Sequence, residues 1–423
     1  MSVRDGAQIS AATLGAGKGG SININTSDSV ELAGTVTLAN GALGVGGIIT
    51  QAFDVGDAGD IKIKTGQLNV RDCSLVSADT TGIGNAGNIR VTGKKLTVEG
   101  GAQISASTIG LGKGGSLTID AKEVEVIGRT NGNRRFPSLL TTQSGDFAIQ
   151  TPEQNIGSGS AGNLTILAEN LSVRDGAEIS TRTFSGGKGG SLTINIGKTL
   201  QTNNGVISAT SAQTSGGNIT ITAKDIRLRN NSNILTNSGG GNGGNITLNA
   251  NTIIALEGSN ILAFAPKGQG GNITFNTRAF LSSPLYYPTA PTTDAVTLEA
   301  LNRDSRVDVN ASGAVSGTIT GVPNTTFIQN SLTELPQNAI DTNALIANSW
   351  ISRGTKRQEN SFTITGSGAL RNSPGDVLIS AYTTGDVRSV EPTPHPWKKG
   401  DPIIEPQGLY RLPNGQLILS RSC

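Results

Sequence analysis

Apolar and polar residues alternate in short runs along the first two thirds of the chain. One stretch shows the pattern in full, with Thr, Asn, Lys or Arg flanking Ile219, Ile221, Ile226, Leu228 and Ile234. A period of two places alternate side chains on opposite faces of a β-strand, whereas an amphipathic helix needs a period near 3.6. We therefore predict short strands, three in each repeat, and no helix between them.

A short phrase recurs along the same region. It is Gly-Asn-Ile-Thr-Ile from Gly217 to Ile221, and the related phrases begin at Gly20, Gly59, Gly87, Gly115, Gly162, Gly190, Gly244 and Gly271. Most successive starts are separated by about 28 residues, a fixed period that is typical of a solenoid. The intervals from Gly20 to Gly59 and from Gly115 to Gly162 are longer, which predicts insertions near 40–56 and 129–160.

These patterns predict an all-β fold, a right-handed parallel β-helix over residues 1–279. Each turn of the helix, here called a rung, would place its three strands directly on the strands of the rung before. After residue 279 the repeat stops, and residues 280–423 hold 12 of the 15 prolines, both Trp and all four Tyr. We expect this second region to be mostly β and to cap the open end of the solenoid. Ile254 and Leu256 would lie on the outer face of a late rung and be covered.

Two recurrent polar features have structural explanations. Asn163, Asn218, Asn245 and Asn272 occupy equivalent positions and should form a hydrogen-bonded ladder along the stack; an N-glycosylation site would need a loop instead. Asp-Gly pairs at residues 5–6 and 175–176 favour a turn between strands, and the Gly-Lys-Gly-Gly corners suggest positive φ angles as well. None of these features needs a catalytic role.

Composition and charge exclude several classes of protein. Aromatic residues make up 4% and charged residues 15% of the chain, too few for a coiled coil or a helical bundle of this Gly content. A formal net charge of +2 gives no basic footprint for nucleic acid. No apolar stretch approaches the roughly 20 residues of a transmembrane helix. His395, the single histidine, excludes paired-histidine zinc sites.

Few residues suggest bound groups or reactive chemistry. Two Gly-x-Gly-x-x-Gly matches precede strands rather than helices, so we predict no nucleotide and no other cofactor. Asp54, Asp57 and Asp60 form a weak candidate for calcium, which we leave open. Cys73 takes a corner position where other rungs have glycine and should be inert; whether it or Cys423 pairs with anything is also left open.

The rung at residues 171–180 and 189–194 and the tail phrases at residues 327–332, 344–349 and 406–415 are the most distinctive parts of the chain. In these residues the chain resembles cyanobacterial exoproteins of the filamentous haemagglutinin type. It implies a secreted or cell-surface protein of the two-partner pathway, which an outer-membrane transporter exports. The secretion domain of that family and a signal peptide are not recognisable after Met1, so we expect the carboxyl-terminal part of a longer exported protein or a truncated gene.

We accordingly expect a non-enzymatic β-helix that mediates adhesion to cells, surfaces, proteins or extracellular polysaccharide. A polysaccharide-active enzyme is one alternative, with Asp146 and Glu153 as its candidate carboxylates; a remnant that is not exported is another. For partner contact we single out the insertion near 129–160, which holds an aromatic and basic cluster of Arg134, Arg135, Phe136 and Phe147. The same insertion could instead be a loop that covers a rung edge.

Overall fold

The structure is a computed structural model, and it divides the chain into two units, Met1–Gln337 and Asn338–Cys423. The residues described are 1–37, 39, 43–130, 136–145, 159–184, 186–283, 287–288, 298–323, 388–389, 408–411, 414 and 417–420.

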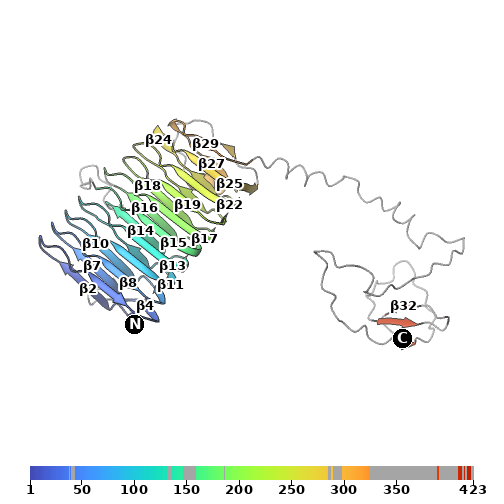
Figure 1. Ribbon diagram of the computed structural model, residues 1–423, viewed down its shortest axis with the longest axis horizontal. Helices are drawn as coiled ribbons and strands as arrows, with labels where there is room; N and C mark the ends of the chain where they lie inside the picture. Colours follow the sequence, from blue (N-terminus) through green and yellow to red (C-terminus); the bar gives the residue numbers. More distant parts are fainter. Residues whose placement is uncertain are drawn as a thin grey trace. The chain divides into compact units, whose positions relative to one another are not determined.

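The first unit is built on two long sheets of parallel strands, and strands from successive rungs lie side by side (Figure 1). The larger sheet consists of β1 (Ser2–Arg4), β3 (Ile22–Asn25), β4 (Ser29–Ala33), β8 (Ile61–Lys64), β9 (Gln67–Arg71), β11 (Ile89–Glu99), β13 (Leu117–Ile127), β15 (Leu164–Arg174), β17 (Leu192–Asn203), β19 (Ile219–Thr222), β20 (Asp225–Arg229), β22 (Ile246–Leu256), β25 (Ile273–Ser283) and β29 (Ile319–Thr320).

The second sheet runs along the other side of the solenoid. It consists of β2 (Gln8–Thr13), β7 (Gly47–Ala52), β10 (Leu75–Thr80), β12 (Gln103–Ser105), β14 (Leu139–Ser144), β16 (Glu178–Thr183), β18 (Val206–Ser211), β21 (Asn233–Leu235), β23 (Asn260–Leu262), β27 (Asp308–Asn310) and β26 (Tyr287–Pro288). Each strand pairs with its counterpart one rung away, as when Ile89 lies opposite Leu117 in β13. The predicted all-β, parallel, repeating fold is confirmed.

The rungs are not all divided into the three short strands that the sequence predicts. In β11, β13, β15, β17, β22 and β25, the first two predicted segments join into one strand of 11 or 12 residues. The third segment lies in the second sheet. A rung therefore presents two sheets to solvent, and the longer strands bring more outward side chains onto one of them.

Inward side chains form aliphatic columns through the whole stack. One column, of residues at most 1% exposed, contains Ile61, Ile89, Leu117, Leu164, Leu192, Ile219, Ile246 and Ile273. The residues between them face outward, so each strand has the alternating pattern seen in the sequence. A single rung could not enclose such a column, and stability must accumulate as rungs are added.

Glycines serve two different purposes in the corners. At the predicted Asp-Gly turn, Asp175 and Gly176 have φ angles of 60° and 84°, which confirms positive φ there. The glycine that begins each repeated phrase is different, since Gly190 and Gly217 do not have positive φ. A Cβ on either would lie 1.9 Å from the carbonyl oxygen of the equivalent glycine one rung earlier. Close approach of two backbones, rather than φ, explains the repeated phrase.

The first insertion is a short antiparallel hairpin. Its strands are β5 (Thr35–Thr37) and β6 (Leu43–Val45), whereas residues 47–52 already belong to the regular strand β7. The extra residues of the second long interval fall on either side of β14, which pairs in register with β12 and β16. Both rungs thus keep their sheets in register despite the added residues.

Parallel pairing continues past residue 279, into a part of the chain that we assigned to the capping region. β27 and β29 extend the two sheets, and β24 (Ala265–Gln269) pairs with β28 (Gly313–Val315). Helix α1 (Leu298–Arg303) packs Leu301 on the outer side of the second sheet, against Leu235 and Leu262. Ile254 and Leu256 alternate with the inward residues of β22 and lie on its outer face, where both are half-buried.

The described residues of the second unit form a small three-stranded sheet of β30 (Arg388–Ser389), β31 (Gly408–Arg411) and β32 (Leu417–Ser420). β31 and β32 are antiparallel. The few residues of this unit that the structure describes are thus mainly strand.

Candidate functional site

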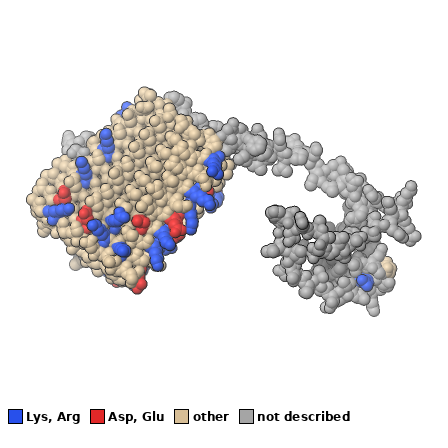
Figure 2. Space-filling view, in the orientation of Figure 1, with Lys and Arg blue, Asp and Glu red and all other residues tan. Residues whose placement is uncertain are grey.

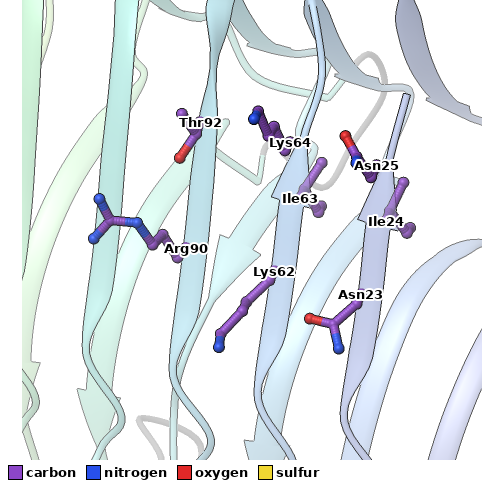
Figure 3. Close-up of a pocket in the computed structure, with 8 residues that line it drawn as sticks. All are labelled: Asn23, Ile24, Asn25, Lys62, Ile63, Lys64, Arg90 and Thr92. Atoms are coloured by element: carbon purple, nitrogen blue, oxygen red, sulfur yellow. The ribbon is translucent and has the colours of Figure 1, made fainter. Parts of the chain in front are cut away.

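The candidate site is a shallow basic groove on the outer face of the first unit, here called the basic groove (Figure 3). Outward side chains of β3, β8 and β11 line it, because the residues on either side of them face the core. Its lining side chains are those of Asn23, Asn25, Lys62, Lys64, Arg90 and Thr92, together with the edges of Ile24 and Ile63.

Strand register arranges these side chains in two columns. Asn23 lies opposite Lys62 and Lys62 opposite Arg90, while Asn25, Lys64 and Thr92 form the second column. Adjacent strands are ~4.8 Å apart, and alternate residues of one strand are ~6.6 Å apart. The depression has a volume of about 290 Å³ and adjoins one of about 600 Å³ that reaches Lys94. The groove therefore suits an extended chain rather than a compact ligand.

The groove is electropositive. Lys62, Lys64 and Lys94 are exposed, and none of the described residues forms an ion pair with them. Arg90 faces Asp120, but the nitrogen and oxygen are 3.9 Å apart and both side chains are about half exposed. Neighbouring cations of this kind repel one another, and an anion bound among them relieves that repulsion.

A hydrogen-bonded ladder beside the groove fixes its geometry. The Asp60 carboxylate accepts the backbone N–H of Asn88 at 2.8 Å, and the Asn88 amide oxygen accepts that of Ser116 at 3.0 Å. Farther along the stack, Asn245 and Asn272 continue the predicted asparagine ladder in the same way. The ladder is confirmed, with backbone N–H groups as donors.

The predicted partner-contact cluster is largely beyond what the structure describes. Arg134, Arg135 and Phe147 lie outside the described residues. Phe136 is described and is 52% exposed; its N–H donates to Thr130 Oγ1 at 2.9 Å. The base of this insertion packs on the glycine corner of the next rung, where Arg129 covers Gly176. That packing fits the alternative of a loop that covers a rung edge, and the role in contact stays a prediction.

Of the other carboxylates that the sequence suggested for catalysis or calcium binding, some are described by the structure and some are not. Asp146 and Glu153 lie outside the described residues. The Asp57 carboxylate accepts two hydrogen bonds from Asn85, as Asp60 does from Asn88. Among the described residues, no three His, Cys, Asp or Glu side chains lie together as a metal site would require.

The pKa values of Cys73 and Asp79 are both raised. Burial raises the pKa of the Cys73 thiol, which keeps it protonated and a poor nucleophile. Burial also raises the pKa of Asp79 to about 6, against hydrogen bonds from Ser77, Ser105 and the Ser107 N–H that favour the carboxylate. Asp79 faces outward from the second sheet, and no other carboxylate accompanies it in these contacts.

Sequence reasoning missed the basic groove. Lys62 and Arg90 are one repeat apart, and each appeared to be an ordinary polar residue of a strand. The available signal was the period itself, because basic residues at the same offset in adjacent rungs must lie in one column.

Comparison with known proteins gives no match to a family model, to a curated protein or to a solved structure. Within the described ranges, the helices are too short and too polar to span a membrane.

Proposed function

We propose that this protein is a non-enzymatic, secreted or cell-surface β-helix that mediates adhesion, and that its basic groove binds acidic polysaccharide. In this proposal the helix is right-handed and the chain is part of a longer exoprotein of the filamentous haemagglutinin type, exported by an outer-membrane transporter. The resemblance of the repeats and of the tail phrases to that family supports the export route and the cyanobacterial origin. The groove supports the choice of ligand.

The observation that carries the proposal is a pair of exposed lysines, Lys62 and Lys64, next to Arg90. Neither lysine forms an ion pair with any of the described residues. Their spacing along and across the strands allows several carboxylates of one extended polyuronate to be contacted together. Each exposed contact is weak, so binding should depend on their number and on ionic strength. Asn23 and Asn25 add amide groups that can hydrogen-bond sugar hydroxyls.

Adhesion of this kind requires no reactive group. A rigid rung presents its side chains at fixed distances, and the ladder of Asp60, Asn88 and Ser116 limits movement beside the groove. Preorganisation of this kind reduces the conformational entropy that is lost on binding. The function follows from an ordered surface rather than from a catalytic site.

A binding assay with fluorescent polygalacturonate on the full chain tests the proposal. The triple variant Lys62→Gln, Lys64→Gln, Arg90→Gln should bind about tenfold more weakly or worse, and wild-type binding should fall steeply as salt is added. The control variant Lys113→Gln, Lys188→Gln, Lys267→Gln removes the same charge from exposed positions outside the groove and should bind as the wild type does. Equal affinity of both triple variants, or equal binding of neutral dextran, would overturn the proposal.

A further inference from the structure

A column of aligned threonines occupies the outer face of the larger sheet beyond the basic groove. Strand register places these residues directly opposite one another from rung to rung. We call the surface around them the threonine face, and its central column is Thr118, Thr165, Thr193, Thr220, Thr247, Thr274 and Thr320.

A second column lies two positions farther along each strand and is polar from Asn195 onward, after Leu167 on β15. Its later members are Asn195, Thr222, Asn249 and Asn276. The Asn249 amide donates to Thr222 Oγ1 at 3.1 Å, and the Asn276 amide donates to Asn249 Oδ1 at 2.8 Å. These bonds hold the side chains in one orientation, so the second column is ordered before any ligand arrives.

The asparagine ladder supplies a third column, two positions before the threonines. Asn218, Asn245 and Asn272 each direct their side-chain oxygen at the following rung, where the N–H of Asn245, Asn272 or Thr318 donates to it. Each of these rungs thus has the outward sequence Asn, Thr, then Asn or Thr. Threonine adds its own stiffness because branching at Cβ restricts χ1.

The three columns form a regular two-dimensional array. Equivalent residues repeat every ~4.8 Å along the stack and every ~6.6 Å along a strand. Stacked parallel strands in register produce little drift between rungs, so the array keeps these spacings over consecutive rungs. Both repeats are of the same order as the distances between water molecules on the flat planes of ice.

The chemistry of the face favours ordered water over other ligands. Between Thr165 and Asn276 the three columns contain no charged and no aromatic residue. Figure 2 shows a broad area of this kind, free of Lys, Arg, Asp and Glu, beside the charged side chains. A polyanion would need cations there, and a flat sugar surface is usually bound by stacking on aromatic rings. Threonine instead offers one hydroxyl and one methyl at each lattice point.

We infer that the threonine face binds ice. Its hydroxyls hydrogen-bond to water molecules spaced as in the crystal, while its methyl groups order the water between columns. Fixed side chains make this favourable, since little conformational entropy is lost when the ordered layer forms. The activity is separate from polysaccharide binding and uses other rungs, so either can hold without the other.

The test measures thermal hysteresis and incorporation of the fluorescent, full-length protein into a growing ice hemisphere. Wild-type protein should shape ice crystals and enter the ice. The variant Thr220→Lys, Thr247→Lys should enter it about tenfold less. Lysine at this column is compatible with the fold, because Lys62 occupies the same column in an earlier rung.

The control variant Thr97→Lys, Ser172→Lys adds the same two charges to one outward column farther along β11 and β15, outside the three columns of the threonine face. It should enter ice as the wild type does. Absence of ice shaping by the wild-type protein, or equal incorporation of both variants with unchanged β-sheet circular dichroism, would overturn the inference. Polygalacturonate binding should persist in the Thr220→Lys, Thr247→Lys variant, which separates this result from failure of the adhesion proposal.

Discussion

The basic groove and the threonine face occupy the same outward positions of the same stack, yet only the groove carries lysine and arginine at those positions. Lys62 and Arg90 are in one column with Thr118, and the inward residues beside them, Ile61 and Ile89, are as aliphatic as those of later rungs. The comparison shows that inward columns specify this fold, whereas outward columns can be rewritten rung by rung. A solenoid can therefore carry two different surfaces on one scaffold.

The largest effect should come from breaking an inward column. Ile194 is fully buried, and Ile194→Ala would leave a cavity that the rungs above and below cannot close. We expect the free energy of unfolding to fall by about 2–5 kcal/mol. Chemical denaturation followed by circular dichroism measures it.

Thr193 is the adjacent outward residue and provides the matched control. Thr193→Ala should cost less than about 1 kcal/mol, because its side chain is partly solvated and only strand propensity is lost. Similar losses for the two variants would contradict the distinction between inward and outward columns.

A smaller loss is expected at the corners. Gly190→Ala would place a Cβ 1.9 Å from the Gly162 carbonyl oxygen, so the two rungs must separate locally. We expect a loss of about 1–3 kcal/mol, as for other overpacked sites. Gly15→Ala is the control, since nothing lies within 4 Å of a Cβ there. A melting temperature unchanged by Gly190→Ala would show that close approach does not explain the repeated glycine.

Much of the inward architecture could be predicted from the sequence. The regular spacing of the repeated phrase and the alternation around Ile219 and Ile221 were sufficient for parallel stacked strands. The turn at Asp175-Gly176 could also be predicted, because it depends only on these two residues. The role of Gly190 could not be predicted, because its constraint comes from a carbonyl one rung away.

The candidate site was harder to predict for a related reason. Its residues are ordinary in each strand, and only the register of β3, β8 and β11 brings them together. The aromatic and basic cluster that did stand out in the sequence, Arg134 to Phe136, is in an insertion, where no repeat constrains the position of a side chain. Periodicity therefore predicts columns well and irregular segments poorly.

Asp79 faces outward, yet unlike most outward residues it affects stability, because its carboxyl group is buried. It therefore gives a pH-dependent prediction. Its pKa of about 6 exceeds the ordinary value of 3.8, so its contribution to stability is fully present below pH 3.8 and is lost as the pH rises toward 6. The shift sets an upper limit of about 3 kcal/mol, which partial access of water reduces to about 1 kcal/mol.

The variant Asp79→Asn removes this titration while retaining an acceptor for the Ser107 N–H. It should be about 1 kcal/mol more stable than the wild type near pH 8 and equal to it near pH 3. Denaturation midpoints across that range measure the difference. A constant difference at every pH would show that burial of the carboxylate is not the cause.

The smallest change in stability should come from a substitution at Asp120, which lies between the basic groove and the threonine face. Asp120→Asn removes the anion facing Arg90 at 3.9 Å, and an exposed pair of this length contributes less than about 0.5 kcal/mol. Polygalacturonate affinity should nevertheless rise about threefold, because Arg90 becomes available and a repulsive carboxylate is lost. Asp54→Asn removes the same charge from an exposed position outside the lining of the groove and should leave affinity unchanged. Equal gains from the two variants would mean that net charge, rather than the columns of the groove, determines binding.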